Sequence, residues 1–434
     1  QAEDADRAFQ RFHALQEDTG AKPEDFRAAK KELNRILDGL RDQLDRFLSG
    51  DYDQKNLESD KKFEAWRASH EPFHWFIEFY GIMNAGGFDV IIGNPPYVEL
   101  KELKCKIPRG YKTEKCSNLY ALVMEISFLI GQQDGQHGFI VPVSSISTDR
   151  YESLQEKTAG RLHIHSSFDD RPSRLFDGLE HIRLTIHLFG SEKKKTRFSS
   201  RYHKWHASER SKLFETVSFQ PSNSIQIPKA LPKLADPEEP NIQKKLVNTG
   251  SEIRSLLTKH SPNQIYYSRK VGYFLQVLNF EPEVRDGNGE KRPPSEFKQL
   301  NFSNEIEALA ALCSLNSSLF YWFITVNSDC RHVNKREVEH MRIPTSKRMT
   351  PKEIEKLSTL SISLINKLKN TSETKVMKFK HDTLTIQCII PKKFIPSSPR
   401  STRCWRRTTA SPRRSWISSS TTTSNTGWGW ADDE

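Results

Sequence analysis

Several features that mark large protein classes are missing from this 434-residue sequence. No apolar run approaches the roughly 18 residues that a membrane span needs, which favours a soluble protein. The N-terminus, QAEDADRAFQ, has neither a methionine nor the basic and then apolar pattern of a secretory signal, so we expect a cytoplasmic protein. The six cysteines are scattered singly without a C-x-x-C pair, so neither a disulfide framework nor a zinc site is indicated.

Positive charge, by contrast, is present in excess. Lys and Arg number 66 against 55 Asp and Glu, which gives a formal net charge of +11. A polyanion such as nucleic acid suits that balance. Because solubility alone explains such a charge about as often, composition gives only a modest preference for a nucleic-acid partner.

The first 80 residues are typical of helices. Between residues 7 and 48, apolar side chains recur every three to four positions, which places them on one face of a helix. They are Leu33, Ile36, Leu37, Leu40, Leu44, Phe47 and Leu48. We expect residues 1–80 to form a helical hairpin, inserted ahead of a larger body. The SGDYD run at residues 49–53 ends the pattern, and an aromatic segment follows it.

The stretch GGFDVIIGNPPYVEL, residues 86–100, places two prolines directly after an apolar run. The run at residues 88–92 lies between glycines and is typical of a buried strand. Because proline cannot donate to a sheet ladder and pushes the preceding residue into an extended conformation, the strand should end at Gly93. Residues 94–97 then form a stiff tip at the carboxyl end of a strand, where open α/β sheets bind ligands.

This tip is rich in hydrogen-bond acceptors. Asn94 offers an amide oxygen, and the prolines offer carbonyls without an N–H. Two acceptors at one point suit a group with two N–H donors, such as the exocyclic amine of adenine. By accepting both hydrogens, they would keep the lone pair of the amine nitrogen from delocalising into the adenine ring. Tyr97 offers a ring on which a base can stack. A base inside a duplex cannot reach such a loop, so the nucleotide would have to be flipped out.

The run FDVIIGNPPY resembles the signature loop of the gamma-class adenine-N6 DNA methyltransferases of type IIG restriction-modification systems. The resemblance implies a doubly wound, Rossmann-like α/β domain, here at residues 81–195, with S-adenosylmethionine as methyl donor. It further implies that Asn94 and the Pro95 carbonyl hold the amine, that Pro96 stiffens the loop and that Tyr97 stacks on the base. Asn94 would also lie beside the cofactor. An ordinary proline turn is the simpler interpretation, which the flanking strand and glycines disfavour.

The sequence after the loop continues this resemblance. We expect a helix at residues 118–130, a turn at Asp134 and Gly135, and a second buried strand at residues 138–143. In the next block of the family pattern, Phe168 and Phe176 are candidates to lie near the target base, although a place in the core is favoured for both.

Acidic side chains in the same block could suggest a metal site. Asp169, Asp170 and Glu180 are the residues concerned. Because Arg171, Arg174 and Arg183 can pair with them, we expect a salt-bridged surface and no metal.

The strand and glycine-rich turn that hold the cofactor in this family have no counterpart before Gly86. The upstream glycines stand singly, and no G-x-G pair follows a strand. We therefore expect a sequence truncated at its N-terminus, with the missing cofactor-binding half, from the same gene or a separate chain, as a partner. A sheet without that half would expose the apolar edge at residues 88–92 and dissolve poorly alone.

The chain changes character after about residue 190. Residues 196–252 are basic and then proline-punctuated, as in a linker, and residues 253–392 resemble the target-recognition region of the type IIG group, expected as a mixed α+β domain. Side chains of the types that bind phosphates and base edges cluster there. These candidates for contacts with double-stranded DNA are Arg269, Lys270, Arg331, His332, Asn334, Lys335 and Arg336. A solvated basic turn is the simpler alternative.

The last segment, residues 393–434, has no periodicity. It holds Trp405, Trp416, Trp428 and Trp430 among Ser, Thr and Arg, and disorder is the default interpretation. A frameshift is the interpretation that we favour over disorder, because a one-base shift with G/C-rich codons turns the segment into an amphipathic helical sequence. We assign no nucleic-acid role to its arginines.

Other functions compete with adenine-N6 methyl transfer. A non-catalytic DNA-binding module, or a decayed relic, would also lack the cofactor turn. A nuclease would need an acidic pair and a Glu-x-Lys on adjacent strands, and the acidic and basic residues at 24–31 lie in a helical context instead. Methyl transfer to another planar amine, such as protein glutamine, is a further alternative, but the charge and the long recognition region favour DNA.

Overall fold

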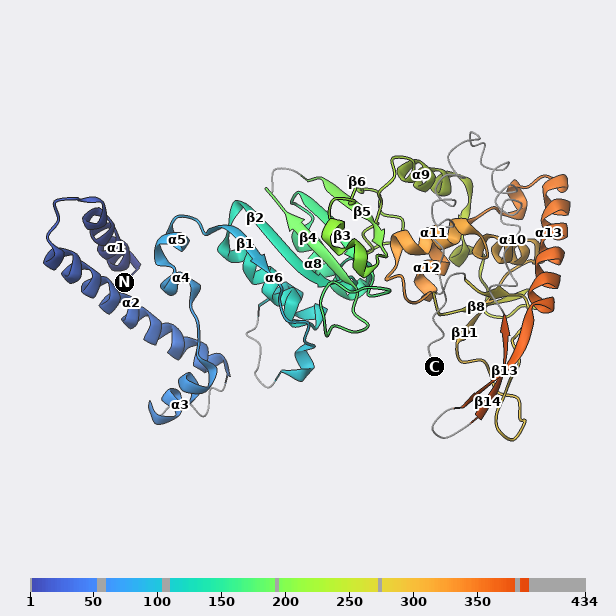
Figure 1. Ribbon diagram of the computed structural model, residues 1–434, viewed down its shortest axis with the longest axis horizontal. Helices are drawn as coiled ribbons and strands as arrows, with labels where there is room; N and C mark the ends of the chain where they lie inside the picture. The colour runs from blue at the N-terminus through green and yellow to red at the C-terminus, as the bar shows by residue number, and fades with distance from the viewer. Residues whose placement is uncertain are drawn as a thin grey trace. The chain divides into compact units, whose positions relative to one another are not determined.

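The structure is a computed structural model that describes residues 2–52, 60–103, 110–191, 195–271, 275–378 and 383–389 (Figure 1). The chain divides into two compact units. Unit 1 comprises Gln1–Pro142, Arg150–Ile164 and Ile186–Thr196, and unit 2 comprises Val143–Asp149, His165–Thr185 and Arg197–Glu434. The predicted tail at 393–434 lies outside the described residues.

A helical hairpin opens unit 1, as the apolar spacing predicts. Helix α1 (Ala2–Glu17) packs on α2 (Pro23–Tyr52), which begins with a proline where no N–H is needed (Figure 1). Ala5, Ala29 and Leu33 are buried. Helix α2 runs through Ser49 and Gly50 to Tyr52, so the expected break at residue 49 is wrong.

The aromatic segment forms three short helices, α3 (Asp60–His70), α4 (Trp75–Glu78) and α5 (Tyr80–Asn84). Trp75 and Phe79 pack edge-on against Phe88, the first residue of the next strand, with ring centroids 5.8 and 5.2 Å away. Gly87 joins helix and strand with φ +107°, and a Cβ there would meet the Ile130 carbonyl oxygen at 2.3 Å.

A six-stranded sheet has the order β1-β2-β4-β3-β5-β6. Its strands are β1 (Phe88–Gly93), β2 (Gly131–Pro142), β3 (His163–Phe168), β4 (Leu184–Phe189), β5 (Arg197–His203) and β6 (Gln220–Pro221). Strands β1 and β2 are parallel and joined through α6 (Leu119–Ile130), which confirms the predicted strand, helix and strand. The expected turn at Asp134 and Gly135 is instead an irregularity within β2, since Phe88 pairs with Gly131 and Val90 with Gln136.

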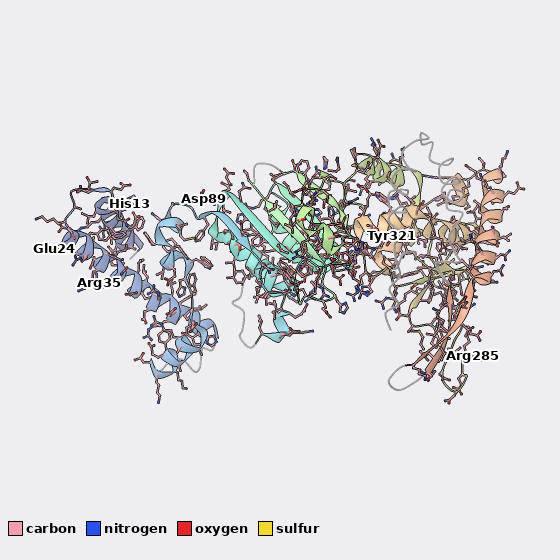
Figure 2. All side chains as sticks on the ribbon, in the orientation of Figure 1. His13, Glu24, Arg35, Asp89, Arg285 and Tyr321 are labelled. Carbon is pink, nitrogen blue, oxygen red and sulfur yellow. The ribbon has the colours of Figure 1, made fainter. Side chains whose placement is uncertain are left out.

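Strand β1 is an edge strand and is not fully buried, contrary to the prediction. Val90 is 57% and Ile92 82% exposed, and Asp89 on the same strand is exposed too (Figure 2). Ile91 points the other way and packs on a core of α6 and β2 side chains. The expected open apolar edge is therefore present, because no strand pairs with the outer side of β1 among the described residues.

Short helices fill the connections of the sheet. They are η1 (Leu100–Glu102), η2 (Lys112–Cys116), α7 (Ser144–Ser147), η3 (Asp149–Tyr151), α8 (Glu152–Thr158) and η4 (Ala207–Lys212).

Residues 196–252 are not an extended linker. They contain β5, β6 and helix α9 (Glu239–Thr249), and Ile227, Ala230 and Leu234 are buried. The linker prediction is wrong because the apolar residues between the prolines are buried in a core.

The rest of unit 2 mixes helices and strands around one large core. Strand β8 (Gln264–Ser268) lies between β9 (Val277–Leu278) and β11 (Phe297–Asn301), and β7 (Ser251–Glu252) pairs with β12 (Arg342–Ile343). A third sheet joins β10 (Val284–Arg285), β14 (Thr383–Ile389) and β13 (Ser372–Lys378). The helical elements are η5 (Ile253–Leu256), α10 (Glu305–Leu315), α11 (Ser318–Asn327), α12 (Lys335–His340), η6 (Ser346–Arg348) and α13 (Pro351–Asn370).

Local sequence explains where these helices begin. Asn304 and Ser317 cap α10 and α11, and Thr350 with Glu353 forms a capping box on α13. Within the described ranges no single helix is long and apolar enough to span a membrane, and α10 and α11 pass that test only together, as a pair bent by 70°.

Candidate functional site

Residues 94–97 form a loop at the carboxyl end of β1, as predicted. The last ladder pair joins Gly93 to Phe139, and the prolines follow at once. Pro95 is buried, whereas Asn94 and Pro96 are exposed and Tyr97 is half-buried. The buried proline anchors the tip, so the Asn94 side chain is presented from a fixed backbone.

The Tyr97 hydroxyl lies between two acceptors. Its oxygen is 2.6 Å from Asn94 Oδ1 and 2.8 Å from the Ile140 carbonyl oxygen on β2. Burial raises the pKa of Tyr97 to about 12, so the hydroxyl keeps its proton at neutral pH. With one hydrogen it can donate fully to only one of the two acceptors. The oxygen predicted to hold an amine is thus already hydrogen-bonded within the loop.

The Tyr97 ring sits at the margin of the unit 1 core. It meets Tyr120 edge-on at a centroid distance of 6.3 Å. Stacking of a base on this ring stays a prediction.

The chain beyond the loop is tied to the start of α6. Asn118 caps that helix through Tyr120 N, and the amide of Leu119 donates to the Val98 carbonyl at 2.8 Å. Arg150 pairs with Glu99 and also donates to the Ser117 carbonyl at 3.0 Å. The hydrogen bond from Arg150 lowers the pKa of Glu99, so this carboxylate stays charged. Its ion pair with Arg150 fastens the chain just after the loop to the rest of unit 1.

The two aromatic candidates for the target base differ in access. Phe168, at the end of β3, is 1% exposed and stacks on His203 at 5.1 Å, with Phe214 edge-on at 5.9 Å. Its ring is not accessible to a base in this conformation. Phe176 lies on the loop between β3 and β4 and is partly exposed.

The acidic residues of that loop are paired with arginine as expected, but Asp169 and Asp170 are buried, so the expected salt-bridged surface is wrong for them. Arg183 Nε lies 3.5 Å from Asp169 Oδ1 and 3.3 Å from Asp170 Oδ1. Arg174 pairs with Glu180 at 3.1 Å. Burial raises the pKa of Asp169, which weakens any anionic site there. No group of three His, Cys, Asp or Glu side chains able to hold a metal occurs in the described part of the chain.

The structure brings the two predicted DNA-binding clusters together. Lys270 and His332 form an antiparallel bridge, the Val333 amide donates to the Arg269 carbonyl at 2.7 Å, and Val271 donates to Arg331 at 3.0 Å. Segments some sixty positions apart therefore lie side by side. We call Arg269, Lys270, Arg331 and His332, with Lys335 further along the second segment, the basic ridge.

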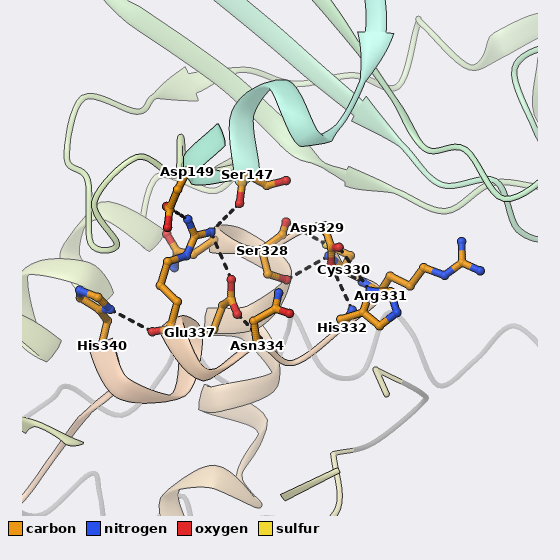
Figure 3. A network of polar contacts seen from close by, with 12 residues as sticks. Ser147, Asp149, Ser328, Asp329, Cys330, Arg331, His332, Asn334, Glu337 and His340 are labelled. Carbon is orange, nitrogen blue, oxygen red and sulfur yellow. Dashed lines mark hydrogen bonds and ion pairs between the residues drawn. The ribbon is translucent and has the colours of Figure 1, made fainter. Parts of the chain in front are cut away.

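Arg336 and Asn334 have internal partners instead. The Arg336 guanidinium bonds Asp149, the Ser147 carbonyl and Glu337, and its side chain is 17% exposed (Figure 3). Asn334 forms a capping box on α12 with Glu337. Burial raises the pKa of Glu337, and Arg336 opposes that rise. Both side chains form bonds within unit 2, so a contact of either with DNA stays a prediction.

Lys270 and Lys335 are the most available members of the ridge. Their side chains are 73% and 71% exposed, and each pairs only loosely with a surface glutamate, Glu296 at 3.6 Å and Glu339 at 3.3 Å. Exposed pairs of this kind are worth about 0–1 kcal/mol, so a phosphate could replace them.

S-adenosylmethionine is the cofactor that the sequence resemblance implies. Residues 2–52 and 60–87 form helices and no strand, so the strand and glycine-rich turn expected to hold the methionine part are absent from them. Asn94 is the candidate cofactor contact, at the end of the open strand β1. The residues described here do not fit the whole cofactor.

Residues 20–176 match the model of a known family, the Eco57I restriction-modification methylase. Over that part, the chain resembles restriction-modification methyltransferases. A protein of Methanocaldococcus jannaschii, named as a type II restriction enzyme and methyltransferase, is 34% identical over 139 residues, which cover 29% of this chain and 12% of the relative. The chain thus spans about 12% of the length of that relative.

Solved structures resemble the chain more weakly. A nuclease-deletion mutant of the Type ISP restriction-modification enzyme LlaGI, in complex with a DNA substrate mimic, is 10% identical with a TM-score of 0.38 and covers 77% of this chain and 48% of that one. The DrdV–DNA complex is 16% identical with a TM-score of 0.28, and the match covers 36% of this chain and 19% of that one. We base no functional argument on likenesses of this size.

Sequence reasoning missed the long-range partners of the site. The Tyr97 hydroxyl reaches Ile140, and Arg150 reaches Glu99, across 43 and 51 positions. Neither contact leaves a local pattern in the sequence.

Proposed function

We propose that this chain carries the target-adenine site and the DNA-recognition region of an adenine-N6 DNA methyltransferase of a restriction-modification system, acting in the cytoplasm. The observation that carries the proposal is the loop at residues 94–97, fixed at the end of a parallel strand inside the segment that matches the methylase family. Asn94 Oδ1 and the Pro95 carbonyl would accept the two hydrogens of the N6 amine, which keeps the lone pair of the nitrogen available to attack.

Tyr97 has a second task in this proposal. When the amine arrives, the hydroxyl of Tyr97 can donate to the Ile140 carbonyl alone, which leaves Asn94 Oδ1 to the substrate. The ring then serves as the stacking surface for a flipped adenine. The basic ridge would hold the phosphates of the duplex.

S-adenosylmethionine, when bound, supplies the methyl group. We propose that most of its binding site comes from a further cofactor-binding half, encoded by the same gene or by a separate chain. This chain would contribute Asn94 and the open side of β1.

The test is methyl transfer to adenine in duplex DNA, with the full chain supplied alone and together with an upstream methylase fragment. We expect activity only with the fragment. Asn94→Ala should lower the rate of methyl transfer by roughly 100-fold or more, because it removes a group that contacts the reacting atoms. Asn288→Ala, an exposed asparagine in a distant turn, is the matched control.

One observation favours a second candidate, a non-catalytic DNA-binding fragment. The described residues before β1 lack the cofactor turn. DNA binding without methylation, even with the upstream fragment present, would decide for this candidate and against catalysis.

A further inference from the structure

The loop between β3 and β4, at residues 169–183, is held in place by arginines from within unit 2. Arg210 donates to the carbonyls of Arg174 and Leu175 at 3.2 and 2.8 Å. Arg183 donates to the Asp329 carbonyl at 3.2 Å. An exposed loop therefore keeps a defined shape, so side chains at its surface are presented in fixed positions.

Two further arginines meet on one residue of this loop. Arg171 Nη2 lies 3.3 Å from His181 Nδ1, and Arg331 Nη1 donates to the His181 carbonyl oxygen at 3.0 Å. These guanidinium groups come from positions 160 residues apart. Figure 3 shows the Arg331 side chain extending away from the network around Glu337.

The carboxylates nearby have closer partners than Arg171 and Arg331, although the charge of Arg171 is among the causes that lower the pKa of Asp170. Asp329 Oδ1 accepts the backbone amides of Arg331 and His332 at 2.8 and 3.0 Å. Asp169 and Asp170 pair with Arg183, and Glu180 pairs with Arg174. Among the described residues, neither Arg171 nor Arg331 forms an ion pair. Like charges brought to one residue repel each other, and an anion bound by both guanidinium groups would offset that repulsion.

We propose that Arg171, His181 and Arg331 bind one phosphate group of the nucleic-acid backbone. This inference rests on the proposed function. Guanidinium groups present forked donors that match phosphate oxygens, and the imidazole adds a further donor. A backbone phosphate fits better than a free one because Arg331 and its neighbour His332 continue into the basic ridge. A phosphate held here would fix the duplex beside the loop that carries Phe176.

The experiment measures binding of a labelled DNA duplex by the full chain over a range of salt concentrations. Arg171→Gln and Arg331→Gln should each weaken binding several-fold and lower the slope of log K against log salt by about 1. Because both arginines serve one phosphate, the double variant should lose little more than the stronger single variant. Arg285→Gln, an exposed arginine on β10, is the matched control and should leave the slope unchanged (Figure 2).

Further measurements distinguish a wrong phosphate site from a folding defect and from a wrong proposed function. Arg331→Lys keeps the charge and should recover part of the affinity, whereas a folding defect would persist and would show in the circular dichroism spectrum. If the wild type binds DNA and the variants match it, this inference is wrong while the proposed function stands. If the wild type does not bind DNA, both fail. If inorganic phosphate binds the wild type but not the double variant, while both bind DNA equally well, the site takes free phosphate and the backbone assignment is overturned.

Discussion

The loop at residues 94–97 and the basic run at residues 331–336 are both candidate sites, but they are built differently. Everything that defines the loop as a loop lies within a few residues: an apolar strand, a glycine and two prolines. The basic run is defined by composition, and its members separate in the folded chain, since Arg336 turns inward and Lys335 outward. A motif that restricts the backbone predicts geometry, whereas a cluster of charges predicts only that some of its members are on the surface.

The largest effect that would sharpen this contrast is expected at Arg336. Arg336→Ala leaves Glu337, 1% exposed, without its charged partner and should lower the free energy of unfolding by roughly 3 kcal/mol. Its neighbour is the control, because Lys335→Ala on the exposed face should change stability by no more than about 0.5 kcal/mol. Urea denaturation of both variants measures the difference, and equal values would mean that Arg336 is a surface residue after all.

A second effect concerns buried imidazoles that no local pattern predicts. Burial lowers the pKa of His187 in unit 1 to about 3 and that of His203 in unit 2 to about 4, below the value near 6.5 of an unfolded histidine. The unfolded state therefore binds more protons below pH 6.5, and stability should fall as the pH drops from about 6.5 toward 4, by at most about 1.4 kcal/mol per group and pH unit. Denaturation midpoints at pH 7 and pH 5 test this, and a His187→Gln variant should show a shallower dependence.

A smaller effect tests the hydroxyl of Tyr97. Tyr97→Phe keeps the ring and removes the hydrogen bonds to Asn94 and Ile140, so methyl transfer in the complemented enzyme should fall by about tenfold, the equivalent of one hydrogen bond. Tyr97→Ala should fall much further, because the stacking surface is lost as well. Equal losses in the two variants would show that the ring contributes nothing.

The smallest expected effect is at the surface of the ridge. Lys335→Ala should weaken DNA binding a few-fold without changing stability, and the loss should vanish at high salt. A duplex-binding titration at two salt concentrations is sufficient. A loss that persists at high salt would point to a contact other than a phosphate.

The sequence predicted well wherever the determinants were local. The hairpin, the end of β1 at Gly93 and helix α6 all follow from short-range rules. It failed where burial was decided at a distance. Proline spacing at residues 196–252 suggested a linker, because nothing local says that Ile227 and Leu234 reach a core. Likewise, Arg171 was expected to pair with an acidic neighbour, yet it meets His181.

The open side of β1 has a consequence for the cell as well as for the site. A strand that has no neighbour on one side among the described residues, and that exposes Val90 and Ile92, is the kind of segment that chaperones bind and proteases cleave. The steady-state amount of this chain would then depend on how quickly something covers that strand during synthesis. Co-expression with a covering partner should therefore raise the yield of the chain even when Asn94 is mutated, which separates abundance from chemistry.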